Sequence, residues 1–230
     1  MKIFNLIILA SFTKATDFTL DANAHVRCFP QSANVLFLID SSTSSGANNF
    51  VDLINRVIPF ILDEFNESLS KFLLSVVSYT QKLTEIMPLH ESFDIDLVKA
   101  KITILQQDNQ IPNHILALKK SATVFTDLVD VPNFCLWFTD GDFIENFKET
   151  INQADRLKSF CQIFIINIGS NNNNMKLMRL ASAPNFVFDS SKLDEFLQKT
   201  RRIFISACQQ SIHRKFSTKL IRFKHDTQEF

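Results

Sequence analysis

Short apolar runs alternate along this chain with longer segments in which apolar residues recur every three or four positions. The short runs predict strands buried on both faces, and the longer segments predict amphipathic helices. The predicted strands span residues 35–39, 72–79, 82–88, 134–138, 162–168 and 185–188. The predicted helices span residues 46–65, 93–105, 114–128, 143–160, 175–181 and 193–208.

This order of elements predicts an α/β fold, a doubly wound and mostly parallel sheet with helices on both faces. The strand at 82–88 is expected at the edge and to end at Pro88, because proline cannot donate within a strand ladder. Pro59 is expected to kink the first long helix. With no internal repeat or linker, the 230 residues fit one large domain.

The first predicted strand runs directly into an acid and four hydroxyl side chains. Asp40, Ser42 and Ser44 stand at every second position there. Ligands of open α/β sheets bind at the carboxyl ends of strands, and oxygen-only clusters suit hard cations such as Mg²⁺. The alternative is a strand end followed by a serine-rich helix cap.

A second acid, Asp140, follows the strand at 134–138 within Thr139-Asp140-Gly141. In a doubly wound layout the two strands are neighbours at the switch point, so both acids face one crevice. Two carboxylates with the Ser42 and Ser44 hydroxyls form a divalent-cation site that leaves a position open for water or a partner oxygen. Asp142 is either an additional outer acid or the cap of the next helix.

On these motifs the chain resembles the von Willebrand factor A (VWA) domain family, which includes the integrin I domains. Asp40-x-Ser42-x-Ser44 is similar to that family's metal-ion-dependent adhesion site (MIDAS), and Thr139-Asp140-Gly141 is similar to its second acidic segment. The resemblance covers Ala33 to about Cys208. It implies a mainly parallel six-stranded sheet with one short antiparallel edge strand. It also implies a site in which a carboxylate from the partner completes the coordination of the cation.

The family site also takes a threonine from the loop before the third helix, and here the resemblance fails. Aligning Ala117-Leu118 with the family's usual Ala-Leu places Pro112 at the threonine position. Proline has no hydroxyl, and the carboxamide oxygen of Asn113 is the candidate substitute. A metal-independent interaction domain of the same fold is therefore the alternative to a metal-dependent one.

The amino terminus predicts a secretory signal at residues 1–16, with Lys2 before an apolar segment and cleavage after Ala15. Ala22-Asn23-Ala24 is a second cleavage candidate, and a buried first strand or helix is the alternative reading. The domain is then expected at 33–208, in a secreted protein without a transmembrane segment, since no later run reaches 18 apolar residues.

The four cysteines fit an oxidising compartment. Cys28 and Cys208 bracket the domain and are expected to form a disulfide, because domain termini are often close together. Cys135 and Cys161 each open an apolar strand and form either a second disulfide or two buried free thiols. The sequon at Asn66 predicts a glycan.

Composition excludes several classes of function. The formal net charge of zero gives no electrostatic footprint for nucleic acid, and three glycines cannot build a phosphate-binding loop. The chain has 24 Phe but one Tyr and one Trp, and Phe supplies core volume without a polar group. The tail at 209–230 is a basic amphipathic helix for a membrane or partner, or a solvated extension.

These observations predict a secreted adhesion module for an extracellular protein partner, not an enzyme. The enzymatic alternative uses Asp40 as the nucleophile of an aspartate-based phosphohydrolase. Those enzymes place a second acid two residues later, where this chain has Ser42. There is also no Gly-x-Ser-x-Gly motif, and the five histidines are scattered, with His114 alone expected near the crevice.

Overall fold

The computed structural model of the protein describes residues 33–68, 72–90, 94–125, 131–142, 146–169 and 174–202. A six-stranded sheet has the order β3-β2-β1-β4-β5-β6, and neighbouring strands are parallel except β2 and β3. The strands are β1 (Ala33–Asp40), β2 (Phe72–Tyr79), β3 (Leu83–His90), β4 (Asn133–Thr139), β5 (Gln162–Asn167) and β6 (Val187–Asp189). The chain moves outward from β1 to β3 and then returns to β4, so β1 and β4 meet at the switch point.

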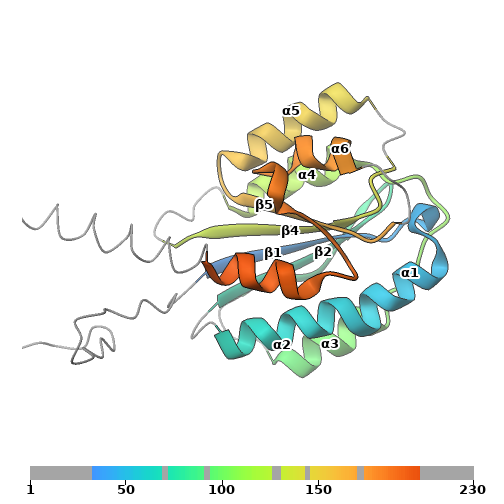
Figure 1. The fold of residues 1–230 in the computed structure, drawn as a ribbon. Helices are drawn as coiled ribbons and strands as arrows, with labels where there is room; N and C mark the ends of the chain where they lie inside the picture. The colour runs from blue at the N-terminus through green and yellow to red at the C-terminus, as the bar shows by residue number, and fades with distance from the viewer. Residues whose placement is uncertain are drawn as a thin grey trace, which may run out of the picture.

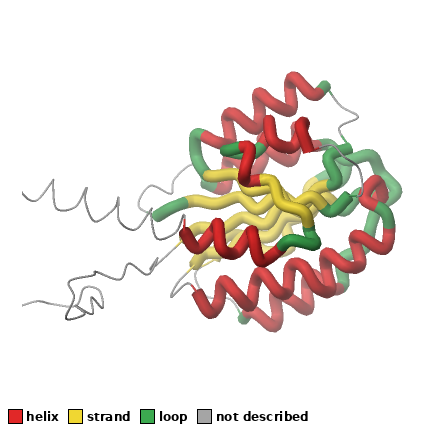
Figure 2. Tube along the Cα trace, in the orientation of Figure 1, coloured by secondary structure: helices red, strands yellow, loops and turns green. Residues whose placement is uncertain are grey.

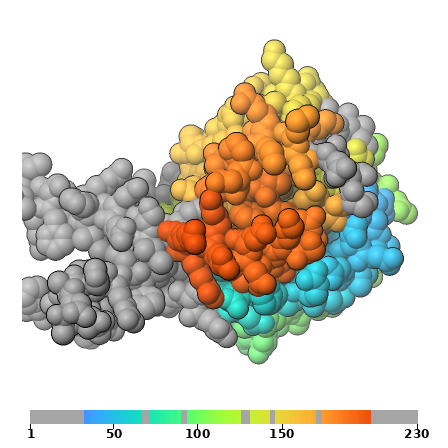
Figure 3. Space-filling model, viewed as in Figure 1, coloured from blue at the N-terminus to red at the C-terminus, as the bar shows by residue number. Residues whose placement is uncertain are grey.

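Helices cover both faces of this sheet (Figure 1, Figure 2). One layer contains α1 (Ala47–Asp52), α2 (Ile58–Ser68), α3 (Ile95–Thr103) and the helical residues 193–202. The other contains α4 (His114–Val124), α5 (Phe147–Lys158) and α6 (Asn174–Leu180). Figure 3 shows residues 174–202, in orange to red, on the face of the molecule toward the viewer, between the yellow segment above and the blue to cyan segment below. The predicted fold is confirmed.

The alternation of side chains along β1 divides them between two cores. Val35, Phe37 and Ile39 point to the layer that contains α2, whereas Leu36 and Leu38 point to the layer that contains α4. All of these side chains are 0% exposed, so β1 is buried on both faces, as its continuous apolar sequence predicts. Asp40 continues the series of Leu36 and Leu38, so its side chain lies on the α4 side.

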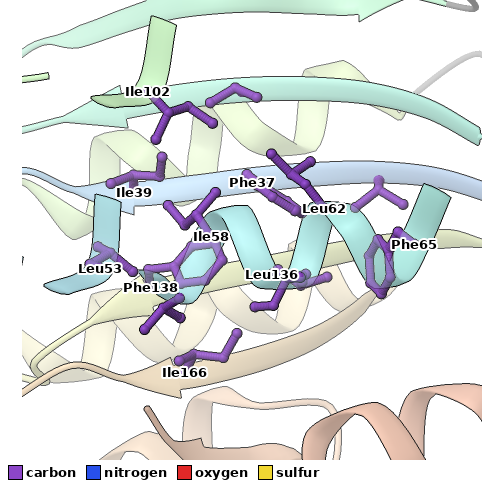
Figure 4. Close-up of a cluster of buried hydrophobic side chains, with 14 of the residues drawn as sticks. Phe37, Ile39, Leu53, Ile58, Leu62, Phe65, Ile102, Leu136, Phe138 and Ile166 are labelled. Atoms are coloured by element: carbon purple, nitrogen blue, oxygen red, sulfur yellow. The ribbon is translucent and has the colours of Figure 1, made fainter. Parts of the chain in front are cut away.

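The core on the α2 side, which we call the phenylalanine core, is packed mainly with Phe and branched aliphatic side chains (Figure 4). Phe37 contacts Phe138 and Phe65 edge to face, with ring centroids 5.4 and 6.5 Å apart. The buried Phe side chains of this core are Phe37, Phe50, Phe65, Phe72, Phe134, Phe138, Phe164, Phe188 and Phe196.

The core on the α4 side, which we call the mixed core, combines aliphatic side chains with Tyr79, Trp137 and two cysteines. Cys135 and Cys161 are buried free thiols in the structure, which is one of the two arrangements open from the sequence. Burial raises the pKa of both thiols, so they stay protonated and unreactive.

The helix predicted to kink at Pro59 is continuous but contains a π-helical segment, Leu53–Val57, between α1 and α2. The backbone N–H of Ile58 bonds to the carbonyl of Leu53, five residues earlier. Because Pro59 has no N–H, the regular bonding pattern is interrupted there, and the π-helical turn adjusts the helix without breaking it.

The edge strand β3 is antiparallel, as expected, but it is eight residues long and continues past Pro88. The prediction that Pro88 ends the strand is wrong. The pairing with β2 shifts between Leu74–His90 and Val76–Met87, which is an irregularity next to the proline. Proline is tolerated at an edge bulge because a backbone position that faces away from the sheet needs no N–H donor.

Several predictions lie outside the described residues. They are the signal at 1–16, the Cys28–Cys208 disulfide and the tail at 209–230. Among the helices that the structure does describe, none combines the length and apolar character needed to cross a membrane.

Candidate functional site

The two predicted acids meet at the carboxyl edge of the sheet. β1 ends at Asp40, and Asp140 directly follows the hydrogen-bonded neighbour β4. The hydroxyl of Thr139 donates to Asp40 Oδ2 over 3.2 Å, and both acids are 1% exposed. The structure therefore brings Asp40 and Asp140 together, as the order of strands implies.

The segment after Asp40 is a tight loop that turns two serine hydroxyls toward each other. The N–H of Ser42 donates to Asp40 Oδ1 over 3.0 Å, which is a local turn typical of aspartate. A 3₁₀ turn over Thr43–Ser45 follows, and Ser42 Oγ lies 2.7 Å from Ser44 Oγ. The three side chains predicted as ligands in this segment therefore converge.

The loop between α3 and α4 fastens this segment. Asp108 pairs with Ser42 as an isolated parallel bridge, and its N–H donates to the carbonyl of Ser41 over 2.9 Å. Gln107 Nε2 donates to the carbonyl of Ser42 and to Ser45 Oγ, over 3.0 and 3.1 Å. Contacts from two neighbouring residues of one loop thus hold the backbone that carries the hydroxyls.

Asp140 differs from Asp40 in having an unpartnered oxygen. Its Oδ1 accepts a hydrogen bond from the N–H of Asp142 over 3.1 Å. Its Oδ2 is buried and has no hydrogen-bond partner in the part of the chain that the structure describes. Leaving a buried acceptor unpaired costs about 1–3 kcal/mol, and more for a charged group. A bound cation would remove that cost.

All three glycines of the chain lie around the site. Gly46 closes the serine loop with a φ of 81°, and Gly141 follows Asp140 with a φ of 73°. Positive φ values are readily adopted only by glycine. A Cβ at Gly169 would lie 2.6 Å from the Cβ of Asp140, so glycine there allows the end of β5 to approach the acid.

Burial raises the pKa of Asp40 from 3.8 to about 7, because the carboxylate loses its hydration. The charge of Asp140 acts in the same direction, while hydrogen bonds from Ser42 and Thr139 lower the pKa. Without a cation, Asp40 therefore keeps its proton at mildly acidic pH. Positive charge at the two acids would favour its ionised form.

A buried hydrogen-bond network leads from Asp40 into the mixed core. The hydroxyl of Tyr79 lies 3.3 Å from Asp40 Oδ2 and 2.9 Å from His114 Nδ1, and it accepts a hydrogen bond from Trp137 Nε1 over 2.7 Å. His114 Nε2 lies 3.3 Å from the carbonyl oxygen of Asp142, whose own N–H binds the second acid. Tyr79, His114 and Trp137 are at most 1% exposed.

The Tyr79 hydroxyl lies at the centre of this network. Burial raises its pKa well above the usual value of 10, so the hydroxyl keeps its proton. It accepts a hydrogen bond from the Trp137 indole and contacts both Asp40 and His114.

The loop residue expected to replace the family threonine has a structural role. The carboxamide oxygen of Asn113 accepts a hydrogen bond from the N–H of Leu116 over 2.8 Å and caps α4. Pro112 is buried beside it and has no oxygen in its side chain. The oxygen of Asn113 is thus directed to the helix terminus.

Two other predicted residues have defined positions. His114 begins α4, as predicted, and is fully buried. The cap of α5 is Asn146, whose side chain accepts from the N–H of Glu149, and not Asp142. The reason is that α5 begins at Phe147, later than the sequence pattern suggests.

Tyr79 and Trp137 belong to the site but have no motif in the sequence that marks them, whereas Thr139 stands in the Thr139-Asp140-Gly141 motif and orients Asp40. The usable signal was composition, since the chain has one Tyr and one Trp among many Phe. In the structure the Trp137 indole donates to the Tyr79 hydroxyl, next to Asp40. Both polar aromatic residues are placed where a hydrogen bond is needed.

The site offers two carboxylates and two serine hydroxyls, an oxygen-only set that suits hard divalent cations. Within the described ranges, no group of three or more His, Cys, Asp or Glu is arranged to hold a metal. With two carboxylates and two hydroxyls, the residues present fit a cation whose remaining positions are filled by water or by another molecule. The unpartnered Asp140 Oδ2 is the observation behind this fit.

Fold and site together define a doubly wound α/β domain with an acid-and-hydroxyl cluster at the carboxyl edge of its sheet. The family profile described as "von Willebrand factor type A domain" matches residues 34–202. The chain therefore belongs to this family, and the resemblance seen in its Asp-x-Ser-x-Ser and Thr-Asp-Gly motifs is confirmed.

Three solved structures of this fold are similar to the chain at low sequence identity. Proximal thread matrix protein 1 (PTMP1) from the mussel byssus is 19% identical, with a TM-score of 0.61 over 77% of this chain and 48% of that protein. The same protein "with zinc occupied MIDAS motif" is 20% identical, with a TM-score of 0.60 over 77% and 46%. Manganese-loaded TRAP protein of Plasmodium vivax is 19% identical, with a TM-score of 0.53 over 70% and 69%.

At these identities the likeness is one of fold, and this chain spans about half the length of the mussel protein. A search of curated protein sequences finds no match.

Proposed function

We propose that this protein is an extracellular binding module that holds a divalent cation, with Mg²⁺ the first candidate, and uses it to bind an acidic group of a protein partner. The ligands are Asp40, Ser42, Ser44 and Asp140. The observation that carries the proposal is the buried, unpartnered oxygen of Asp140 beside a second buried acid. The zinc and manganese named in the structures of two fold relatives support it.

Local contacts orient the two acids for this role. The N–H of Ser42 and the hydroxyl of Thr139 orient the Asp40 carboxylate, and Gly169 leaves room for Asp140. When bound, the cation supplies a positive charge that attracts a carboxylate. The protein side chains fix where that charge lies, so the partner needs an acidic group that reaches the edge of the sheet.

Secretion is part of the same proposal. The signal at 1–16 and the Cys28–Cys208 disulfide remain predictions, because those residues are outside the described ranges. The predicted glycan at Asn66 is compatible with the fold, since this side chain is exposed on α2. Catalysis is not part of the proposal, because the second acid of an aspartate-based phosphohydrolase would stand two residues after Asp40, where this chain has Ser42.

A metal-independent binding module of the same fold is the second candidate. The observation in its favour is the loop before α4, in which Pro112 lacks a hydroxyl and the Asn113 oxygen caps the helix. A pull-down of the secreted protein with Mg²⁺ and with a chelator separates the candidates. Partner capture that persists in the chelator favours the second.

Thermal unfolding during a Mg²⁺ titration tests the first candidate directly. A ligand at 100 times its Kd stabilises the folded state by about 2.7 kcal/mol, so the wild-type Tm should rise with Mg²⁺. Asp40→Ala should abolish the rise, while Asp52→Ala, at an exposed acid on α1, should preserve it. An unchanged wild-type Tm, or an equal rise in Asp40→Ala, would exclude the metal site.

Pro112→Thr is a complementary variant, because it restores the hydroxyl that the family site uses. It should shift the Mg²⁺ titration to lower concentration than in the wild type. Ile111→Thr, which adds a hydroxyl at the exposed neighbouring position, is the matched control and should leave the titration unchanged.

A further inference from the structure

The two acids of the site belong to different strands and are 100 positions apart in the sequence, so something must fix their relative position. The parallel pairing of β1 with β4 fixes the backbone positions of the two acids in part. We propose that Tyr79 and His114 are additional positioning residues, which connect the side chain of Asp40 to that of Asp140 through a chain of polar contacts that is buried at Tyr79 and partly buried at Asp142. The proposal rests on the cation site proposed above.

The first half of the connection joins three elements. Asp40 at the end of β1 contacts the hydroxyl of Tyr79 at the end of β2 over 3.3 Å, and this hydroxyl contacts Nδ1 of His114 at the start of α4 over 2.9 Å. Asp40 and Tyr79 are register partners in the parallel β1–β2 pair. Side chains of paired residues lie on the same face of a sheet, so this contact is set by the register.

The second half returns to the other acid. His114 Nε2 lies 3.3 Å from the carbonyl oxygen of Asp142, and the N–H of Asp142 donates to Asp140 Oδ1 over 3.1 Å. The segment that carries Asp140 is therefore held by α4 as well as by β4. A displacement of His114 would move the backbone of Asp142 and, with it, the carboxylate of Asp140.

The rings of this connection are fixed by packing. His114 lies edge-on to Tyr79 and to Trp137, with centroid distances of 5.7 Å in both cases. All three side chains are at most 1% exposed. Hydrogen bonds in such an apolar surrounding are strengthened, and their geometry is difficult to replace by water.

A purely space-filling role for Tyr79 does not explain these contacts. Phe would fill nearly the same volume, and this chain uses Phe at 24 positions and Tyr at one. The additional oxygen of that one Tyr is the atom that contacts Asp40, His114 and Trp137. The hydroxyl, rather than the ring, therefore makes the connection.

Calorimetric titration of the full chain with Mg²⁺ tests the proposal with Tyr79→Phe. Loss of a hydrogen bond to a charged group should weaken Mg²⁺ binding about tenfold. The matched control is Ser75→Ala, which removes another buried hydroxyl of β2 that donates to the carbonyl of Met87. That variant should bind Mg²⁺ with wild-type affinity.

The emission of Trp137, the only tryptophan of the chain, gives a readout that a general loss of stability would not produce. Saturating Mg²⁺ should change this emission in the wild type, because the indole N–H is bonded to the hydroxyl that contacts Asp40. In Tyr79→Phe the change should be absent even when Mg²⁺ saturates the site.

His114 gives an independent variant. His114→Phe removes both nitrogen contacts and should weaken Mg²⁺ binding about tenfold. His114→Gln, which keeps a polar group toward Asp142, should recover part of that loss. Wild-type affinity in both Tyr79→Phe and His114→Phe would overturn the positioning role alone. Absence of Mg²⁺ binding by the wild-type protein would overturn the proposed function and this role together.

Discussion

The two faces of the sheet are both covered by helices, but they are packed with different chemistry. The phenylalanine core on the α2 side contains aromatic rings that have no polar atom. The mixed core on the α4 side contains Tyr79 and Trp137, which are hydrogen-bonded to each other and adjoin His114. Asp40 points to this second side, so the site and the polar aromatic residues share one face.

The difference suggests a division of tasks between the faces. Phe side chains supply buried area and edge-to-face contacts, which stabilise the fold without directional bonds to the site. Tyr, Trp and His supply buried area and also fix polar atoms in place. Substitutions on the α2 side should therefore change stability alone, whereas substitutions on the α4 side should also change the site.

The largest expected effect is that of Phe65→Ala in the phenylalanine core. Phe65 is 2% exposed and contacts the rings of Phe37, Phe72 and Phe196, so its truncation should cost about 3–5 kcal/mol. Urea denaturation measures the loss, and Mg²⁺ affinity under native conditions should stay unchanged. Ile104→Ala, at a side chain that is 75% exposed, should stay within about 0.5 kcal/mol of the wild type. A changed affinity in Phe65→Ala would contradict the division of tasks.

The next effect is a dependence of stability on pH in the absence of cations. The pKa of Asp40 is raised from 3.8 to about 7 on folding, so the folded protein keeps a proton that the unfolded chain releases. Stability should therefore fall as pH rises from about 4 to 7 and then level off. The rise of the Asp40 pKa from 3.8 to about 7 corresponds to a loss of stability of about 4 kcal/mol.

Denaturation at several pH values in a chelator, with Asp40→Asn as the reference, isolates this contribution from other titrating groups. The wild type should lose stability relative to the variant across that range, and saturating Mg²⁺ should suppress the loss. A constant difference between the two proteins would show that Asp40 titrates normally.

A smaller effect distinguishes two of the glycines. Gly169→Ala and Gly46→Ala should each cost about 1–3 kcal/mol, the first by steric overlap and the second by strain at positive φ. Only Gly169→Ala places a Cβ against Asp140, whereas nothing lies within 4 Å of the corresponding atom at Gly46. Mg²⁺ calorimetry should accordingly show weaker binding in Gly169→Ala alone. Equal affinities in the two variants would mean that Asp140 tolerates displacement.

The smallest effect concerns Asn113. Removing a helix cap costs about 1 kcal/mol, so Asn113→Ala should lower stability by that amount and leave Mg²⁺ affinity unchanged. Asn113→Ser, which retains an oxygen suited to capping, should recover the stability. A loss of affinity in Asn113→Ala would instead identify its carboxamide as a cation ligand.

Most of the fold was predictable from the sequence, because hydrophobic periodicity determines which segments are strands and which are helices. The run Val35–Ile39 and the acid after it identified the central strand and the site end of the sheet. The π-helical segment before Pro59 and the continuation of β3 past Pro88 were not predictable in this way. Both depend on backbone bonding to neighbours, which the pattern of apolar residues does not encode.

The site was predictable only for residues that follow strand ends. Asp40, Ser42, Ser44 and Asp140 are close in space because parallel strands end at one edge. The contact of Tyr79 with His114 depends on strand register and on the position of α4, which involve residues 35 positions apart. The capping role of Asn113 likewise depends on where α4 begins.

The two edges of the sheet have a consequence for the protein at high concentration. An open strand edge is a template for pairing with another molecule, which leads to aggregation. One edge, β3, carries an exposed Pro88, a charged and exposed Glu85 and an irregular register, and the other, β6, is three residues long. Neither edge offers a long, regular row of bonding groups. Copies of this domain crowded together on a surface or in a matrix should therefore remain separate folded units.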